Sequence, residues 1–172
     1  MATAELIELG TMEVDFGELN EIDGPKGKRL FVGLKEVILD TEKIKAKLSS
    51  SIGAGEWATS SDNDSIDSLD VRITLETDDG ELIYTEYSGR GLRNEGLVVA
   101  APTFQTGSEK YKWLNRVQAV MSGQFNMEKG KLFYRLYEVR IKSEEGLVWN
   151  IIWINHTNYS NTLCQNIILL TE

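Results

Sequence analysis

The sequence predicts an all-β protein, folded as an antiparallel β-barrel in a single domain. Short runs in which apolar and polar residues alternate recur from the N-terminus to about residue 141, and this alternation is typical of half-buried strands. Gly, Asp and Ser separate the runs, as expected where the chain turns. Apolar residues at helical spacing are rare along the same stretch. Many short strands with turns between them favour a β-barrel or sandwich over any helical class.

The clearest element is a β-hairpin over residues 70–84. Apolar and polar residues alternate on both sides of Asp78-Asp79-Gly80, and β-branched and aromatic residues fill the flanking strands. Asp-Gly is a preferred dipeptide in tight hairpin turns. The hairpin therefore fixes two neighbouring strands of the predicted sheet.

Further strands are predicted on both sides of this hairpin. In chain order they cover residues 6–16, 30–39, 44–48, 97–101, 113–121 and 132–139. Residues 20–29, 49–55 and 60–70 are predicted to be loops. Gly89-Arg90-Gly91 is interpreted as a turn or crossover, and Pro102 is expected to end the strand before it.

Composition limits the partners of the chain. It has 172 residues, of which 41% are hydrophobic, which suits one domain with its own core. The net charge of −9 argues against nucleic acid or an anionic membrane as a partner, because both would repel the protein. Glu5 and Glu8 lie where a signal peptide would need basic and then apolar residues. We therefore expect a cytoplasmic protein with no nucleic-acid and no membrane partner.

The C-terminal part differs from the rest in composition. We expect a barrel domain at 1–141 and an atypical extension at 142–172, in which 146–154 are strongly apolar but too few to cross a bilayer as a helix. The extension also holds the single histidine, His156, and the single cysteine, Cys164, so an internal disulfide is excluded. An added strand, a strip that joins two chains into a homodimer, and a non-standard exon end remain open interpretations.

Three sequence motifs are specific when they are taken together. They read RxTLETDDGxxIY over 72–84, PxFxTGxxxYxWLN over 102–115 and YEV over 137–139. With these motifs the chain resembles the Domain of Unknown Function 3237 family over about residues 6–139. Gly-Ala-Gly-Glu-Trp at 53–57 looks like the Gly-x-Asp-Trp turn of that family, with Glu56 where Asp is usual.

The resemblance implies a compact antiparallel β-barrel, lipocalin-like in shape, and the family has no general assigned reaction. The chain departs from the family pattern in two places. Residues 32–47 contain Lys and Glu where the family is glycine-rich, and the extension at 142–172 has no family counterpart. These departures bear on the shape of a pocket and on the oligomeric state.

The first strand of the hairpin has one polar and one apolar face. Arg72, Thr74 and Glu76 alternate with the apolar positions 71, 73 and 75. If the apolar face forms the core, Arg72 and Glu76 are an exterior pair worth ~0–1 kcal/mol. If the polar face lines the interior, its groups must bind one another, water or a ligand. Both interpretations stay open.

A polar interior would support proton transfer. A glutamate whose pKa is raised by burial could act as a base, and an arginine could hold a carboxylate or an enolate. The candidate catalytic residues are Arg72, Glu76, Tyr84 and Glu138. The candidate ligand-binding residues are Trp57, Tyr111, Trp113, Asn115, Arg116 and Tyr137.

Two of these candidates have an alternative role. Asn115 would instead tie down a loop at the end of a strand. Trp57 lies between glycine-rich and acidic segments, and it either plugs one end of the barrel or lines the mouth of a ligand site.

Three functions follow from these observations. The first is a barrel that binds a small molecule in its interior. The second is a cofactor-free isomerase, cyclase or lyase that acts on a polyketide-like or aromatic metabolite. The third is a structural or dimerisation module with a filled barrel. The aspartates of 62–70 lack the spacing of a calcium loop, and no flavin or nicotinamide motif is present, so we expect neither a metal nor a cofactor.

Overall fold

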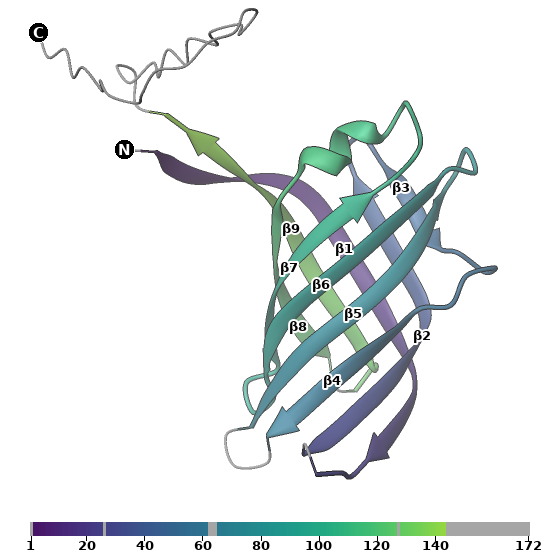
Figure 1. Cartoon of the computed structure of the whole chain (residues 1–172), viewed down its shortest axis with the longest axis vertical. Coiled ribbons are helices and arrows are strands. Elements are labelled where there is room, and N and C mark those ends of the chain that lie inside the picture. The colour runs from purple at the N-terminus through teal and green to yellow at the C-terminus, as the bar shows by residue number, and fades with distance from the viewer. Residues whose placement is uncertain (1, 26, 62–64, 127, 144–172) are drawn as a thin grey trace, which may run out of the picture.

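The computed structural model describes residues 2–25, 27–61, 65–126 and 128–143. Within these residues, nine antiparallel strands form one closed sheet, shown in Figure 1. The predicted all-β antiparallel barrel is confirmed. The apolar segment 146–154, His156 and Cys164 lie outside the described residues, so the role of the extension and the homodimer stay predictions.

The strands follow one another around the barrel almost in chain order. They are β1 (Thr3–Ile22), β2 (Lys28–Thr41), β3 (Lys45–Leu48), β4 (Gly55–Ser61), β5 (Ile66–Thr77), β6 (Leu82–Leu92), β7 (Leu97–Gln105), β8 (Ala119–Asn126) and β9 (Lys131–Lys142). From β5 to β9 each strand pairs with the next, and β9 pairs with β1. The short strands β3 and β4 both lie between β2 and β5, which closes the ring.

The predicted hairpin is confirmed as β5 and β6. Gly80 in its turn has φ of +82°, a conformation that L side chains rarely adopt. The hydroxyl of Thr77 donates to Asp79 over 2.6 Å and closes the turn from one side. The turn chemistry and the alternation of the strands therefore both favour the hairpin.

Two predicted breaks in the sheet are wrong. Gly89-Arg90-Gly91 is not a turn, because all three residues lie within β6. A Cβ at Gly89 would lie 2.3 Å from the backbone oxygen of Val99, so this glycine permits a close approach of β7. Pro102 lies inside β7 and does not end it. Pairing between β7 and β8 extends only from Leu97 to Ala100, so the missing N–H of Pro102 interrupts no ladder there.

Two further segments differ from their predicted type. Residues 60–70 are largely strand, because β4 ends at Ser61 and β5 begins at Ile66. Residues 113–121 are not one strand, since the 3-10 helix η1 (Lys112–Arg116) precedes β8. Leu114 of η1 is buried, and the helix crosses one end of the barrel, at the top of Figure 1.

Aliphatic side chains fill the barrel from η1 to about its middle. The most deeply buried include Leu39, Ile44, Ile73, Leu75, Ile83 and Met121. At the opposite end lie the end of β4 and the turns that follow β6 and β8 (Figure 1). This second end is hollow and contains the candidate site. No helix in the described part of the chain is long and apolar enough to span a bilayer.

Candidate functional site

The first strand of the hairpin turns its apolar face inward. Ile73 and Leu75 are fully buried, whereas the side chain of Arg72 is 48% exposed. Glu76 is half-buried on the outer face, where its carboxylate accepts a weak hydrogen bond of 3.5 Å from Ser49. The interpretation that Arg72 and Glu76 line the interior is therefore wrong. Aliphatic side chains fill this part of the barrel without leaving a charge unpaired.

Arg72→Ala is expected to lower the free energy of unfolding by about 1 kcal/mol or less. Among the described residues, Arg72 makes two exposed contacts, an ion pair with Asp70 at 3.2 Å and a stacking contact 5.5 Å from the ring centre of Trp57. Urea denaturation at neutral pH measures the change. A loss above about 3 kcal/mol, the range of a broken buried pair, would contradict the exterior placement.

Four other predicted site residues also lie away from the interior of the barrel. Trp57 is 40% exposed on the outside, so it neither plugs the barrel nor lines its mouth. The hydroxyl of Tyr84 donates to Glu86 on the outer surface over 2.9 Å. Tyr137 is half-buried on the outer face of β9. Glu138 pairs with Arg140 at 2.7 Å, where β1 and β9 project past the barrel (Figure 1).

The remaining predicted residues close the end of the barrel that η1 crosses. Tyr111 is buried, and its hydroxyl donates to Asp79 over 2.9 Å. Trp113 packs against the core with the ammonium group of Lys43 5.5 Å from its ring centre. Arg116 is exposed.

Asn115 ties down the loop that follows β7. Its side-chain oxygen accepts from the backbone N–H of Thr106 over 2.9 Å, and its amide donates to the backbone oxygen of Thr106 over 3.0 Å. The loop-tying interpretation of Asn115 is thus confirmed. None of the predicted site residues lines the cavity at the other end of the barrel.

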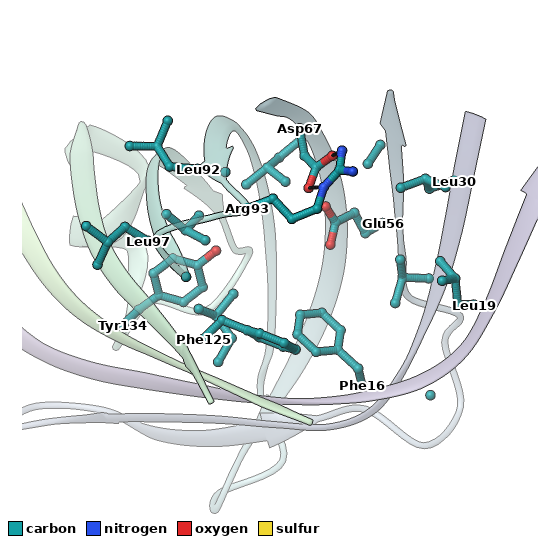
Figure 2. Close-up of a pocket in the computed structure, with 18 residues that line it drawn as sticks. Phe16, Leu19, Leu30, Glu56, Asp67, Leu92, Arg93, Leu97, Phe125 and Tyr134 are labelled. Carbon is teal, nitrogen blue, oxygen red and sulfur yellow. Dashed lines mark hydrogen bonds and ion pairs between the residues drawn. The ribbon is translucent and has the colours of Figure 1, made fainter. Parts of the chain in front are cut away.

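That cavity has a volume of about 360 Å³ and mostly apolar walls (Figure 2). Phe16 of β1 and Phe125 of β8 meet on one wall, with ring centres 5.5 Å apart. The residues that line the cavity include Gly17, Ala58 and Gly91, which have a small side chain or none. The barrel is hollow here because small residues occupy positions that face inward.

Glu56 is the least expected side chain of this cavity. Along β4, Glu56 and Ala58 face inward while Trp57 faces solvent. Glu56 is only 9% exposed, and within the described residues its carboxyl group makes no hydrogen bond or ion pair. Burial, and secondly the negative charge of Asp67, raise its pKa from 4.5 to about 7. Acid and carboxylate forms are therefore both populated at neutral pH.

Asp67 and Arg93 form an ion pair at the mouth of the cavity. The guanidinium Nη2 of Arg93 lies 2.7 Å from Oδ1 of Asp67, and Nε lies 3.4 Å from Oδ2. The same Nη2 contacts the hydroxyl of Ser60. The pair thereby joins the ends of β4 and β5 to the turn after β6, and Figure 2 shows the carboxyl group of Glu56 beside it.

Two buried tyrosines adjoin the cavity on the side of β9 and β6. The rings of Tyr134 and Tyr87 meet edge to face with centres 6.2 Å apart. Burial raises the pKa of both hydroxyl groups well above the usual range, and the charge of Glu56 raises both further. Tyr134 lines the cavity itself and remains a neutral hydrogen-bond donor at physiological pH.

Comparison with known proteins decides the family. The family model described as "Protein of unknown function (DUF3237)" matches residues 4–98 and 91–139. The chain belongs to this family. The resemblance inferred from the sequence motifs is confirmed. No curated protein matches this DUF3237 chain.

Solved structures share the fold of this DUF3237 chain. A beta-barrel like protein from Acinetobacter baumannii AYE is 23% identical, with a TM-score of 0.68 over 80% of this chain and 97% of its own. A conserved protein of unknown function from Rhodopseudomonas palustris is 20% identical, with a TM-score of 0.70 over 80% and 99%. A protein from Penicillium herquei, described as an enzyme, is 19% identical, with a TM-score of 0.59 over 81% and 95%. These similarities support a beta-barrel-like fold, while the lipocalin-like shape stays a prediction.

The sequence contained one signal for the site of this DUF3237 chain. Glu56 falls in the Gly-Ala-Gly-Glu-Trp motif, whose resemblance to the family pattern predicts a turn and not a site. Continuing the alternation through Ala58 would have placed Glu56 and Ala58 on one face and Trp57 on the other. No sequence pattern places Asp67 or Arg93 in the site, because each lies next to a turn and is typical of a loop.

Proposed function

We propose that this DUF3237 chain binds a small, largely apolar molecule in the cavity and exchanges a proton with it through Glu56. The position of Glu56 is the observation that carries the proposal. The residue is only 9% exposed in a cavity with mostly apolar walls, and its carboxyl group has no hydrogen-bond or ion-pair partner among the described residues. A buried polar group without a protein partner is costly, so a bound ligand or water is its natural complement.

The cavity supports binding of a small molecule. Its volume of about 360 Å³ falls within the range of known small-molecule sites, roughly 300–1,000 Å³. Water filling this space would find few polar partners on walls formed by residues such as Phe16, Leu69 and Phe125. An apolar ligand that displaces poorly bound water gains affinity.

The pKa of Glu56 supports a catalytic role in addition to ligand binding. A general acid or base works best when its pKa lies near the operating pH, and Glu56 meets this condition at about 7. Its acid form can donate a proton to a ligand, and its carboxylate can remove one. Such transfer steps are the basis of isomerase, cyclase and lyase reactions on aromatic metabolites. One structural neighbour, from Penicillium herquei, is described as an enzyme, which favours a catalytic role over binding alone.

Glu56→Gln is expected to slow proton abstraction from a probe bound in the cavity. The probe is nitrobenzisoxazole, a neutral aromatic compound. A base removes its ring C–H proton, the N–O bond breaks, and a coloured cyanonitrophenolate forms. The wild-type protein should accelerate this reaction with a rate that rises with pH around a midpoint near 7. Glu56→Gln should lower the rate by about 100-fold, the usual contribution of a positioned general base.

Two further variants provide controls. Glu36→Gln changes an exposed carboxylate on β2 and should leave the rate unchanged. Gly91→Val should block the cavity, since a Cβ at position 91 meets Asp67 at an ordinary 3.5 Å and a larger side chain extends into the space. Calorimetry with ethylbenzene should detect binding to wild type and Glu56→Gln but not to Gly91→Val. Equal probe rates in wild type and Glu56→Gln would exclude the proposed proton transfer.

A further inference from the structure

The charged groups in the wall of the cavity do not balance one another. Among the described residues that line it, the side chains with a carboxyl or guanidinium group are Glu56, Asp67 and Arg93. Arg93 is paired with Asp67, with Nη2 2.7 Å from Oδ1 and Nε 3.4 Å from Oδ2. These two charges offset each other. The carboxylate of Glu56 therefore leaves one net negative charge inside the cavity.

The strands beside Glu56 offer its carboxyl group no partner. In the sheet register Glu56 lies opposite Val32 of β2 and Val71 of β5, and both neighbours have aliphatic side chains. Glu56 is only 9% exposed, and its carboxyl group makes no hydrogen bond or ion pair with another described residue. Figure 2 shows this carboxyl group pointing into the cavity. A buried carboxylate is stable only with a compensating cation or donor, which a ligand in the cavity can supply.

We propose, building on the function above, that the ligand is a largely apolar amine whose ammonium group binds the carboxylate of Glu56. When the amine enters as the free base and Glu56 is in its acid form, the proton moves from the carboxyl oxygen to the amine nitrogen. This transfer forms the ion pair without any further reactant. The proton exchange proposed above thereby gains a ligand group of defined chemistry.

The rest of the cavity suits an apolar amine. The rings of Phe16 and Phe125 lie with centres 5.5 Å apart, and aromatic faces attract a cation as well as hydrocarbon. A buried ion pair usually costs about as much in lost hydration as it gains. Folding has already removed most water from Glu56, so only the amine loses its hydration on binding. The net charge of −9 also favours a cationic ligand over an anionic one.

The pKa of Glu56 is about 7, so its charge changes between pH 5 and pH 8. The other charged or titratable side chains around it and at the mouth of the cavity are Glu21, Lys28, Asp67, Tyr87, Arg93 and Tyr134. Lys28 of β2 pairs with Glu21 of β1 at 3.4 Å, as Arg93 pairs with Asp67. Burial raises the pKa of both tyrosines well above the usual range, so they stay neutral. The pH dependence of amine binding therefore reports on Glu56.

Benzylamine and ethylbenzene test the proposal as ligands of the same shape, which differ by an ammonium group in place of a methyl group. At pH 8 the amine is a cation and Glu56 is mostly a carboxylate. Calorimetry should show that wild type binds benzylamine about tenfold more tightly than ethylbenzene at this pH. At pH 5 Glu56 is an acid, so the preference should fall about tenfold. The affinity for ethylbenzene should change little between the two pH values.

Proton release is a second measurement on the same complex. At pH 6 most of the protein carries the acid form of Glu56, whereas benzylamine arrives already protonated. Formation of the ion pair should then release about one proton per bound ligand to the solvent. Calorimetry in two buffers of different ionisation enthalpy measures this number. Ethylbenzene should release none.

Glu56→Gln removes the charge and keeps the size of the side chain. At pH 8 the variant should bind benzylamine no more tightly than ethylbenzene, and it should still bind ethylbenzene. Glu36→Gln, which changes an exposed carboxylate on β2, should keep the wild-type preference. Equal affinities in wild type at pH 8, or a preference that persists in Glu56→Gln, would overturn the amine assignment while ligand binding in the cavity stands. If wild type binds neither ligand, both the amine assignment and the proposed function fail.

Discussion

Glu56→Gln is expected to raise the free energy of unfolding at pH 8 by about 3 kcal/mol relative to wild type. The pKa of Glu56 is 4.5 when the side chain is solvated and about 7 in the folded protein. Below pH 4.5 the acid form is present in both states, so burial of the side chain carries no ionisation penalty. As pH rises from 4.5 to 7 the unfolded chain ionises first, and the wild-type protein loses stability. Each pKa unit corresponds to about 1.4 kcal/mol, which gives a total near 3 kcal/mol.

Glutamine removes this penalty because it has nearly the same shape and stays neutral. Urea unfolding at several pH values between 4.5 and 8 measures the effect as the difference between wild type and variant. Other titrating groups contribute equally to both proteins and cancel in that difference. Glu36→Gln, which changes an exposed carboxylate, should show the wild-type pH dependence. Parallel curves for wild type and Glu56→Gln would mean that Glu56 ionises in the folded protein as it does in water.

Gly89→Ala is expected to lower the free energy of unfolding by about 3 kcal/mol, the upper part of the range for overpacking. The new Cβ would lie 2.3 Å from the backbone oxygen of Val99 and 2.9 Å from Cβ of Ala100. Both atoms belong to β7, which pairs with β6 on one side and with β8 on the other. Relief of the overlap therefore requires a shift of the strand itself and not of one flexible side chain.

Gly91→Ala provides a matched control two residues along the same strand and on the same face. A Cβ at Gly91 meets the side chain of Asp67 at an ordinary 3.5 Å. We expect its stability to change by about 0.5 kcal/mol or less, with a small gain from the restricted unfolded chain. Thermal or urea unfolding of both variants measures the difference between their losses of stability. Equal losses would show that both glycines are required for strand formation in general and not for the approach of β7.

The fold was predictable because the hairpin satisfies several local rules at once. The alternation over 70–84 and the Asp-Gly turn both indicate β5 and β6, and the structure agrees. The inward face of β5 was not predictable from the same pattern. Alternation shows that a strand has two different faces, but the curvature of the closed sheet decides which face is buried. Arg72 and Glu76 were therefore assigned to the interior in one interpretation, whereas both lie outside.

The errors in the strand assignments have a common physical cause. Gly89 and Pro102 read as chain breaks, yet each is tolerated because of its neighbouring strand, and that neighbour is not visible in local sequence. The start of β5 reads as a loop because Asp67, a polar residue, occupies an inward position. An inward polar residue removes the alternation signal where a cavity replaces the packed core.

The candidate site was harder to predict than the fold. Glu56, Asp67 and Arg93 come from two strands and a turn, and only closure of the barrel brings them to one cavity. Tyr134 lies farther along the chain, within a strand whose aromatic residues gave no indication of which one faces the cavity. The motifs that identified the family lie mostly on the outer surface or at the end closed by η1. They therefore identified the scaffold and not the site.

The two ends of this barrel differ in a way that bears on how such proteins diversify. One end is packed solid and capped by η1, and it contains most of the deeply buried aliphatic residues. The other end is a chamber, and many of its wall residues, such as Leu19, Leu30 and Leu92, lie outside the core cluster. If the chamber binds a ligand as proposed, substitutions there would alter which compound is accepted while the capped end continues to hold the strands in register. Related barrels can thus acquire different chemistries without first losing the ability to fold.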